Sequence, residues 1–186
     1  GPDQFLAKLD PTGNLLWLTF LGGTGNDYNN GLAVDAGGNA YVVGVSTGTW
    51  GSPVNPMVVA PVGFRDWTIA KVNSGGALQW NTFHGGTNND NALGAALDAS
   101  GGLYVVGDCR TTWGSPLNPY SGGADVTVVK LNAASGLRQW HTFLGQAGGD
   151  YAYDVGYSPD ETLIVAGRSD ASWGAPINPH SGGMDG

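Results

Sequence analysis

The sequence predicts an all-β protein built from a unit of about 60 residues that occurs three times. Glycine accounts for 33 of the 186 residues and charged residues for only 12%, a composition typical of many tight turns and few solvated helices. Tryptophans and aspartates recur at spacings of 63 and 60 residues. They are Trp17, Trp80 and Trp140, and Asp27, Asp90 and Asp150. A fixed period of this length indicates a repeat architecture.

The best-preserved part of the unit is residues 26–44, N-D-Y-N-N-G-L-A-V-D-A-G-G-N-A-Y-V-V-G, which has the pattern of a β-hairpin. Two short apolar runs flank a turn rich in Gly and Asp. The pattern returns from Asn89 and, altered, from Gly149, where S-P-D-E replaces the D-A-x-G turn. We interpret Asp35 and Asp98 as turn residues for this reason.

Each copy is predicted to contain four strands, and no segment has the pattern of a helix. The first strand is expected at 32–35, 95–98 and 155–158, and the second at 40–45, 103–108 and 163–168. The third is expected at 4–9, 67–72 and 126–131, and the fourth at 15–21, 78–84 and 138–144. Length differences between copies fall only in loops and turns, which supports these assignments.

Four-stranded sheets at this period match the blades of a β-propeller better than a sandwich. We expect one repeat domain over 1–186, with units at 4–66, 67–125 and 126–185, and with 4–21 completing the blade begun by 150–168 in a strand-swapped closure. Propellers typically have at least four blades, so three in one chain are too few. We therefore expect a closed ring, either a homodimer with six blades or a homotrimer with nine; the alternative is a fragment of a longer array.

Two segments, D-Q-F-L-A-K-L-D-P-T-G-N-L-L-W-L-T-F-L-G-G-T-G-N-D-Y and G-L-A-V-D-A-G-G-N-A-Y-V-V-G, resemble the bacterial β-propeller repeat family called SBBP. The resemblance covers all three copies. It implies a propeller in a secreted or surface-exposed bacterial protein, without catalytic residues in the repeat itself.

A second resemblance concerns the third copy alone. L-N-A-A-S-G-L-R-Q-W from Leu131 is similar to the docking motif of pyrroloquinoline quinone propellers, which would make the chain a fragment of a quinone-dependent enzyme. The acid, base and metal ligands that such a centre requires do not appear in the sequence. Packing between blades is the better interpretation of Trp17, Trp80 and Trp140.

Charge and cysteine content exclude several classes of partner. The net charge of -8 and the pI near 4.4 make nucleic acid and anionic membranes poor partners. No apolar run approaches 18 residues, so membrane insertion is not expected. Cys109 is the only cysteine and its repeat equivalents are Ser46 and Ser169, which favours a small buried side chain over a reactive thiol. The start at Gly1-Pro2, without Met, is expected of a processed or engineered piece.

The loop after the second strand carries a Trp followed by G-[SA]-P-x-N-P in every copy. We expect this loop on the same face as the loop after the fourth strand, so that face is the candidate ligand surface. The candidate residues are Trp50, Trp113 and Trp173 with Asn55, Asn118 and Asn178. Exposed rings beside Asn suit a glycan or a peptide. The competing interpretation, which we favour, is that each Trp folds back over its loop or wedges between blades.

Other polar residues are weaker candidates. Asp27, Asp90 and Asp150 are possible calcium ligands, but one carboxylate per loop is few, and capping of backbone N–H groups is the better interpretation. His84, His141 and His180 share no motif position, so neither a zinc site nor a triad is predicted. Lys8, Lys71 and Lys130 end the third strand, where we expect each to reach solvent or to pair with a neighbouring blade's Asp.

The sequence therefore favours a non-catalytic propeller scaffold or binding module that needs no cofactor, from a bacterial surface or secreted protein, and that assembles into a closed ring. A purely structural or engineered ring without a ligand is the second hypothesis. A quinone-dependent enzyme is the third.

Overall fold

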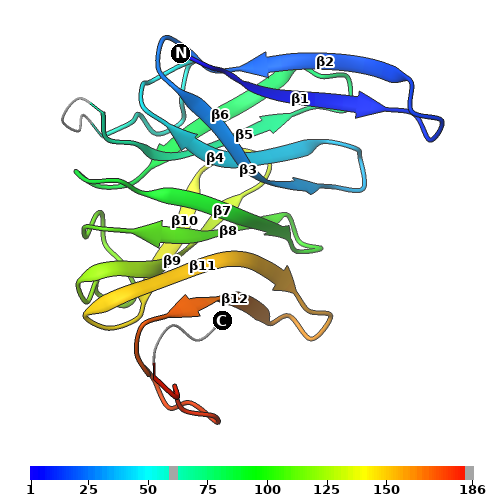
Figure 1. The fold of residues 1–186 in the computed structure, drawn as a ribbon. Coiled ribbons are helices and arrows are strands. Elements are labelled where there is room, and N and C mark those ends of the chain that lie inside the picture. Colours follow the sequence, from blue (N-terminus) through cyan, green and yellow to red (C-terminus); the bar gives the residue numbers. More distant parts are fainter. Residues whose placement is uncertain (59–62, 183–186) are drawn as a thin grey trace.

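The computed structural model describes residues 1–58 and 63–182, and all regular secondary structure in these ranges is β-strand (Figure 1). The twelve strands are β1 (Gln4–Leu9), β2 (Leu15–Leu21), β3 (Asp27–Val34), β4 (Ala40–Ser46), β5 (Asp66–Val72), β6 (Leu78–His84), β7 (Asn91–Leu97), β8 (Gly102–Cys109), β9 (Gly123–Asn132), β10 (Arg138–Leu144), β11 (Gly148–Tyr157) and β12 (Leu163–Ser169). The described part of the chain contains no helix long and apolar enough to cross a membrane.

The strands are grouped into two complete sheets between two half sheets. The complete sheets have the strand orders β3-β4-β5-β6 and β7-β8-β9-β10, and all their neighbours are antiparallel. The half sheets are the hairpins β1-β2 and β11-β12. A short parallel pairing of Gly148 and Gly149 with Gly123 and Ala124 ties β11 to β9. Figure 1 shows the four sheets following one another, with β1-β2 and β12 at opposite ends.

The first strand of each unit is longer than the sequence predicted, beginning at Asp27, Asn91 and Gly148. A β-bulge interrupts each of these strands, for example between Asn29 and Gly31, and it hides the strand start by breaking the alternating pattern. Glycine is required opposite the bulge, because a Cβ at Gly44 would lie 1.8 Å from the Tyr28 carbonyl oxygen. Gly107 and Gly167 are in the same situation.

The same tryptophan contact joins neighbouring sheets twice. The Trp17 indole N–H donates to the Ser74 carbonyl (3.0 Å) in the β5-β6 turn, and the Trp80 indole donates to the Ala133 carbonyl (3.3 Å) in the β9-β10 turn. We call this contact the indole latch. Trp140 occupies the equivalent position on β10. Among the described residues, however, no hairpin made of a third and a fourth strand, which we call an outer hairpin, follows it.

Burial separates the complete sheets from the half sheets. Every residue of β4 and β8 is buried, whereas β12 has Ile164 65% exposed. On β1 and β2, exposed apolar side chains include Phe5, Leu9, Leu18 and Phe20. Among the described residues, β1 and β2 pair only with one another, and β12 pairs only with β11. The pairing of 4–21 with 150–168 is thus not made within one chain in this structure and remains a prediction for the assembly.

Candidate functional site

The tryptophan loop of the first complete sheet folds over its own outer strand. The Trp50 ring is 6% exposed and packs edge-on against Phe83 of β6, with centroids 6.0 Å apart and planes at 83°. The loop then runs beside β6, because the Val54 N–H donates to the Asn81 carbonyl (2.8 Å) and Phe83 donates to the Asn55 carbonyl (3.0 Å). The Asn55 Nδ2 donates to the Phe83 carbonyl at 2.6 Å. We call residues 50–55, 113–118 and 173–178 the clasp loops.

The second clasp loop repeats this geometry on β10. Trp113 packs against Phe143 with centroids 6.2 Å apart and the same 83° between planes. The Leu117 N–H donates to the His141 carbonyl (2.9 Å), and the Phe143 N–H donates to the Asn118 carbonyl (3.4 Å). A clasp loop therefore holds the fourth strand of its own sheet by a Trp–Phe contact and by backbone hydrogen bonds.

The third clasp loop has no fourth strand to hold among the described residues. Trp173 lies over the hairpin β11-β12, and a pocket of about 610 Å³ opens beneath it. Its lining includes Leu144, Tyr151, Val165, Trp173 and Asn178. The side chain of Ile177 is fully exposed. The mainly apolar lining, with a few polar groups, is typical of a binding site.

Repeat equivalence identifies what such a pocket holds elsewhere in the molecule. In the first complete sheet, Phe83 clusters with Leu21, Val42 and Trp50. The equivalents of the last three residues in the third unit are Leu144, Val165 and Trp173, all of which line the pocket. The pocket is therefore the place that a fourth-strand phenylalanine fills in both complete sheets.

The six predicted ligand residues thus divide into two groups. Trp50 and Trp113 pack on Phe83 and Phe143, and Asn55 and Asn118 make the hydrogen bonds just described, so these four hold the chain's own strands. Trp173 and Asn178 line the pocket. Each clasp loop and the loop that precedes the first strand of the same sheet share one face, as predicted. Just before the clasp loops, the Thr47 backbone N–H donates to the Asn26 carbonyl and the Asp170 backbone N–H donates to the Gly149 carbonyl, both at 3.0 Å.

Two histidines that share no motif position meet at Trp113. His141 stacks on the Trp113 ring at 3.9 Å and His84 at 5.7 Å between centroids. Arg138 Nη1 contacts His141 Nδ1 (2.6 Å) and His141 Nε2 contacts the Trp113 carbonyl (2.9 Å), so the neutral Nε2–H tautomer satisfies both. Burial lowers the pKa of His84 to about 3 and that of His141 to about 4, and the Arg138 charge adds to both. These rings are packing elements; no sequence motif indicated the stack.

The recurring aspartates cap the turns that lead into the first strands. Asp27, Asp90 and Asp150 are buried, and their Oδ2 atoms accept the backbone N–H groups of Gly23 (3.0 Å), Gly86 (2.7 Å) and Gln146 (2.9 Å). Asp35 and Asp98 close the hairpin turns, each accepting two backbone N–H groups on Oδ1. Burial alone would raise the pKa of Asp98, but these hydrogen bonds lower it.

A second buried aspartate faces each of two capping aspartates, a pairing that the sequence interpretation missed. Desolvation, with a smaller effect of Asp90, raises the pKa of Asp66 to about 7, and desolvation raises that of Asp90 to about 6. Desolvation and Asp150 likewise raise the pKa of Asp125. The signal was available, because Asp66 and Asp125 also recur with the repeat.

No group of three or more His, Cys, Asp or Glu side chains among the described residues is placed to share a metal ion, and calcium at Asp27, Asp90 and Asp150 stays a prediction.

The expectation that Lys130 pairs with a neighbouring blade's Asp is wrong. Its Nζ lies 3.5 Å from Asp98 Oδ2 within the same sheet, because Tyr104 and Lys130 are cross-strand partners beside that turn. Lys71 instead reaches the Ala133 carbonyl of the next sheet (3.3 Å).

Cys109 is fully buried, accepts a hydrogen bond from the Trp113 indole (3.3 Å), and has a pKa raised well above its ordinary value by burial. It is a packing residue and not an activated thiol.

Comparison with known proteins gives a distant relative. The chain is 26% identical over 192 aligned residues to an uncharacterized WD repeat-containing protein of Acanthamoeba polyphaga mimivirus. The alignment covers 88% of this chain and 14% of that protein, so the chain spans only a small part of its relative's length. No family model matches the chain.

Proposed function

We propose that the chain is a non-catalytic β-propeller scaffold that assembles with further copies of itself into a closed ring, with six blades in a homodimer or nine in a homotrimer. The observation that carries the proposal is the empty clasp loop beside β12 at one end of the array, with the matching outer hairpin β1-β2 at the other. Each half sheet contains what the other lacks.

The relative supports the propeller part of the proposal, because WD repeats are a form of propeller blade. The packing roles of the two buried histidines and of Cys109 support a scaffold over an enzyme. The resemblance to the SBBP family supports a bacterial surface or secreted protein. A quinone enzyme is the competing proposal, and turnover of a redox dye after addition of the quinone would favour it.

The experiment is the mass in solution, measured by light scattering over a wide concentration range. Two chains of 19.0 kDa give a particle of twice that mass, and three chains three times. We expect one of these closed oligomers and no larger oligomers, because a closed cyclic assembly leaves no free sheet edge. A monomer at all concentrations would refute the ring.

A second candidate function is recognition of a glycan or a peptide in the pocket under Trp173. The mainly apolar lining with Asn178 favours it, because ring stacking beside an amide suits both ligands. It predicts binding on a glycan or peptide array that the Trp173→Ala variant loses. Trp50→Ala and Trp113→Ala would not serve as tests, because those rings hold the chain's own strands.

A further inference from the structure

We infer that the pocket under Trp173 is a socket for Phe20 of a second copy, whose β1-β2 hairpin pairs along β12 with Lys8 opposite Ile164. This inference rests on the proposed self-assembly and names the residues, the register and the contacts that make it. We infer the occupant from the first and second clasp loops, where Phe83 and Phe143 fill the equivalent space.

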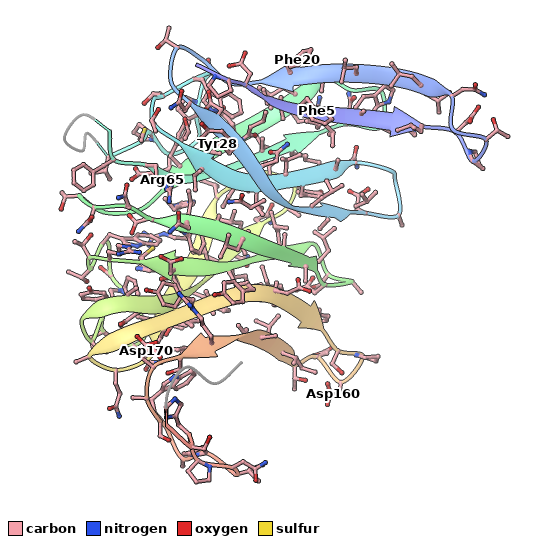
Figure 2. All side chains as sticks on the ribbon, in the orientation of Figure 1. Phe5, Phe20, Tyr28, Arg65, Asp160 and Asp170 are labelled. Carbon is pink, nitrogen blue, oxygen red and sulfur yellow. The ribbon has the colours of Figure 1, made fainter. Side chains whose placement is uncertain are left out.

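Phe20 has the residue type, the position and the exposure that the socket requires. It is the repeat equivalent of Phe83 and Phe143, which are 0% and 2% exposed, whereas Phe20 is 65% exposed on β2. Figure 2 shows Phe20 and Phe5 on the hairpin at the end of the array farthest from Asp170, which directly follows β12. Phe5, Leu18 and Phe20 are all exposed on this hairpin, and an exposed apolar patch marks an interaction site; the pocket supplies Leu144, Val165 and Trp173 as its partner surface.

The register follows from the two complete sheets, which agree with one another. Tyr41 pairs with Lys71 between β4 and β5, and Tyr104 pairs with Lys130 between β8 and β9. The equivalent residues of the third unit and of β1 are Ile164 and Lys8. The preceding pair is Leu163 with Leu9, which covers a Leu9 side chain that is 54% exposed, while its equivalents Val72 and Leu131 are fully buried.

The third clasp loop has the backbone groups needed to hold the incoming strand. By equivalence with the first and second clasp loops, the Ile177 N–H donates to the Leu18 carbonyl of the second copy. The Phe20 backbone N–H of that copy donates to the Asn178 carbonyl. This contact also covers the Leu18 side chain, which is 47% exposed, and the fully exposed Ile177.

The indole latch adds a contact at the next boundary. The turn after β1 is equivalent to the turn after β5, so Pro11 of the second copy takes the place of Ser74 and accepts the Trp140 indole N–H. Gly13 has φ +90°, close to the +91° of Gly76, and a Cβ on Gly13 would meet nothing within 4 Å. At Gly76 the same space is filled by the Trp17 ring, 3.1 Å from the Cβ position. The place beside Gly13 thus fits the Trp140 ring.

The chain's own hairpin is attached at the other end of the array and does not fill the chain's own pocket. The Asp27 N–H donates to the Pro2 carbonyl (2.8 Å), Asn29 Nδ2 donates to the Phe5 carbonyl (2.9 Å), and the Trp17 latch holds β2 on the first complete sheet. These contacts use one side of the hairpin and leave the side with Phe20 and Leu9 uncovered. Figure 1 places this hairpin at the far end from β12.

The test is disulfide trapping in a Cys109→Ser background, which has serine precedents at Ser46 and Ser169. The matched variant carries Lys8→Cys and Ile164→Cys, and the control carries Ala7→Cys and Ile164→Cys. Directly opposed strand residues lie within disulfide reach, whereas a shift by one residue points the side chains to opposite faces. We expect mild oxidation to link most matched chains covalently, with several-fold less linkage in the control, and peptide mass spectrometry to show the 8–164 bond. A second matched pair, Leu9→Cys with Leu163→Cys, serves if the first does not fold.

Two failures have different meanings. If the oligomer forms at the expected mass but neither matched pair links, or the control links equally well, the register and the socket are wrong while self-assembly stands. If light scattering gives a monomer, the proposed function itself fails. Unlinked samples of every variant, checked for the native circular dichroism spectrum and mass, separate both results from misfolding.

Discussion

The second complete sheet, β7 to β10, and the half sheet β11-β12 have the same strand pattern but opposite exposure. β8 is buried along its whole length, whereas its equivalent β12 is partly or fully exposed at every position. Trp113 packs on Phe143, whereas Trp173 lies over a pocket. The difference shows that the repeat encodes each strand, while the burial of the second strand depends on pairing with the third strand of an adjacent hairpin. Four predictions test this comparison.

The largest expected effect is on phenylalanines at equivalent positions. Phe143→Ala should lower the free energy of unfolding by about 3–5 kcal/mol, because it opens a cavity in a packed core. Phe20→Ala should change it by less than about 0.5 kcal/mol in dilute samples below the assembly range, because the side chain is exposed there. Urea denaturation of both variants measures the contrast. Equal losses in dilute samples would contradict it.

Replacing the clasp-loop tryptophan should likewise destabilise the complete sheet more than the half sheet. Trp113→Ala should cost about 2–3 kcal/mol, because the ring buries area against Phe143 and stacks on two histidines. Trp173→Ala should leave the dilute chain nearly as stable and should weaken association instead. Thermal unfolding and sedimentation on the same samples show which property each change affects. If Trp173→Ala assembles like the parent, the pocket is not the contact.

The buried aspartate pair should make stability depend on pH. The folded-state pKa of Asp66, about 7, lies above the ordinary value of 3.8, so its stabilisation is complete below pH 4 and is lost as the pH rises through 7. Asp66→Asn lacks this loss. Its stability relative to the parent should therefore rise by roughly 2 kcal/mol between pH 5 and pH 8.

Parallel melts of the parent and Asp66→Asn at each pH isolate this change from the opposing effect of His84 and His141, which both proteins share. Asp10→Asn is the matched control, because Asp10 lies in the β1-β2 turn and its pKa is lowered, not raised, by hydrogen bonds from Asn14 and Thr12. A relative stability that stays flat from pH 5 to pH 8 in Asp66→Asn would rule out the buried acid. Repeating the melts with calcium tests the candidate metal role of Asp90.

The smallest expected effect concerns the indole latch. Trp80→Phe removes the donor to the Ala133 carbonyl and should cost about 0.5–1.5 kcal/mol beyond the lost ring area. Trp140→Phe should cost less in the dilute chain and more in the assembled one, where Pro11 of a second copy becomes the acceptor. Denaturation below and above the assembly concentration measures both. A cost for Trp140→Phe that is independent of concentration would exclude the latch between copies.

Much of the fold could be predicted from the sequence, because the period and the turn residues recur together. All twelve strands lie where the pattern placed them, apart from the early starts of β3, β7 and β11, which a bulge conceals, and of β9, which begins at Gly123 and not at 126. Trp50 and Trp113 pack on Phe83 and Phe143 of the fourth strands, a contact that the sequence interpretation did not name. Contacts between sheets, such as the stack of His84 on Trp113 and the Asp66–Asp90 pair, could not be predicted, since no motif spacing links residues that meet through packing.

The most direct measurement is hydrogen exchange of residues 163–167 as a function of concentration, with the equivalent residues 103–107 as an internal reference. If a second copy fills the edge of β12, the two segments should become similarly protected once the oligomer forms, and only 163–167 should lose protection on dilution. Fast exchange of 163–167 in samples that contain the full oligomer would show that the strand edge is not the place where copies meet.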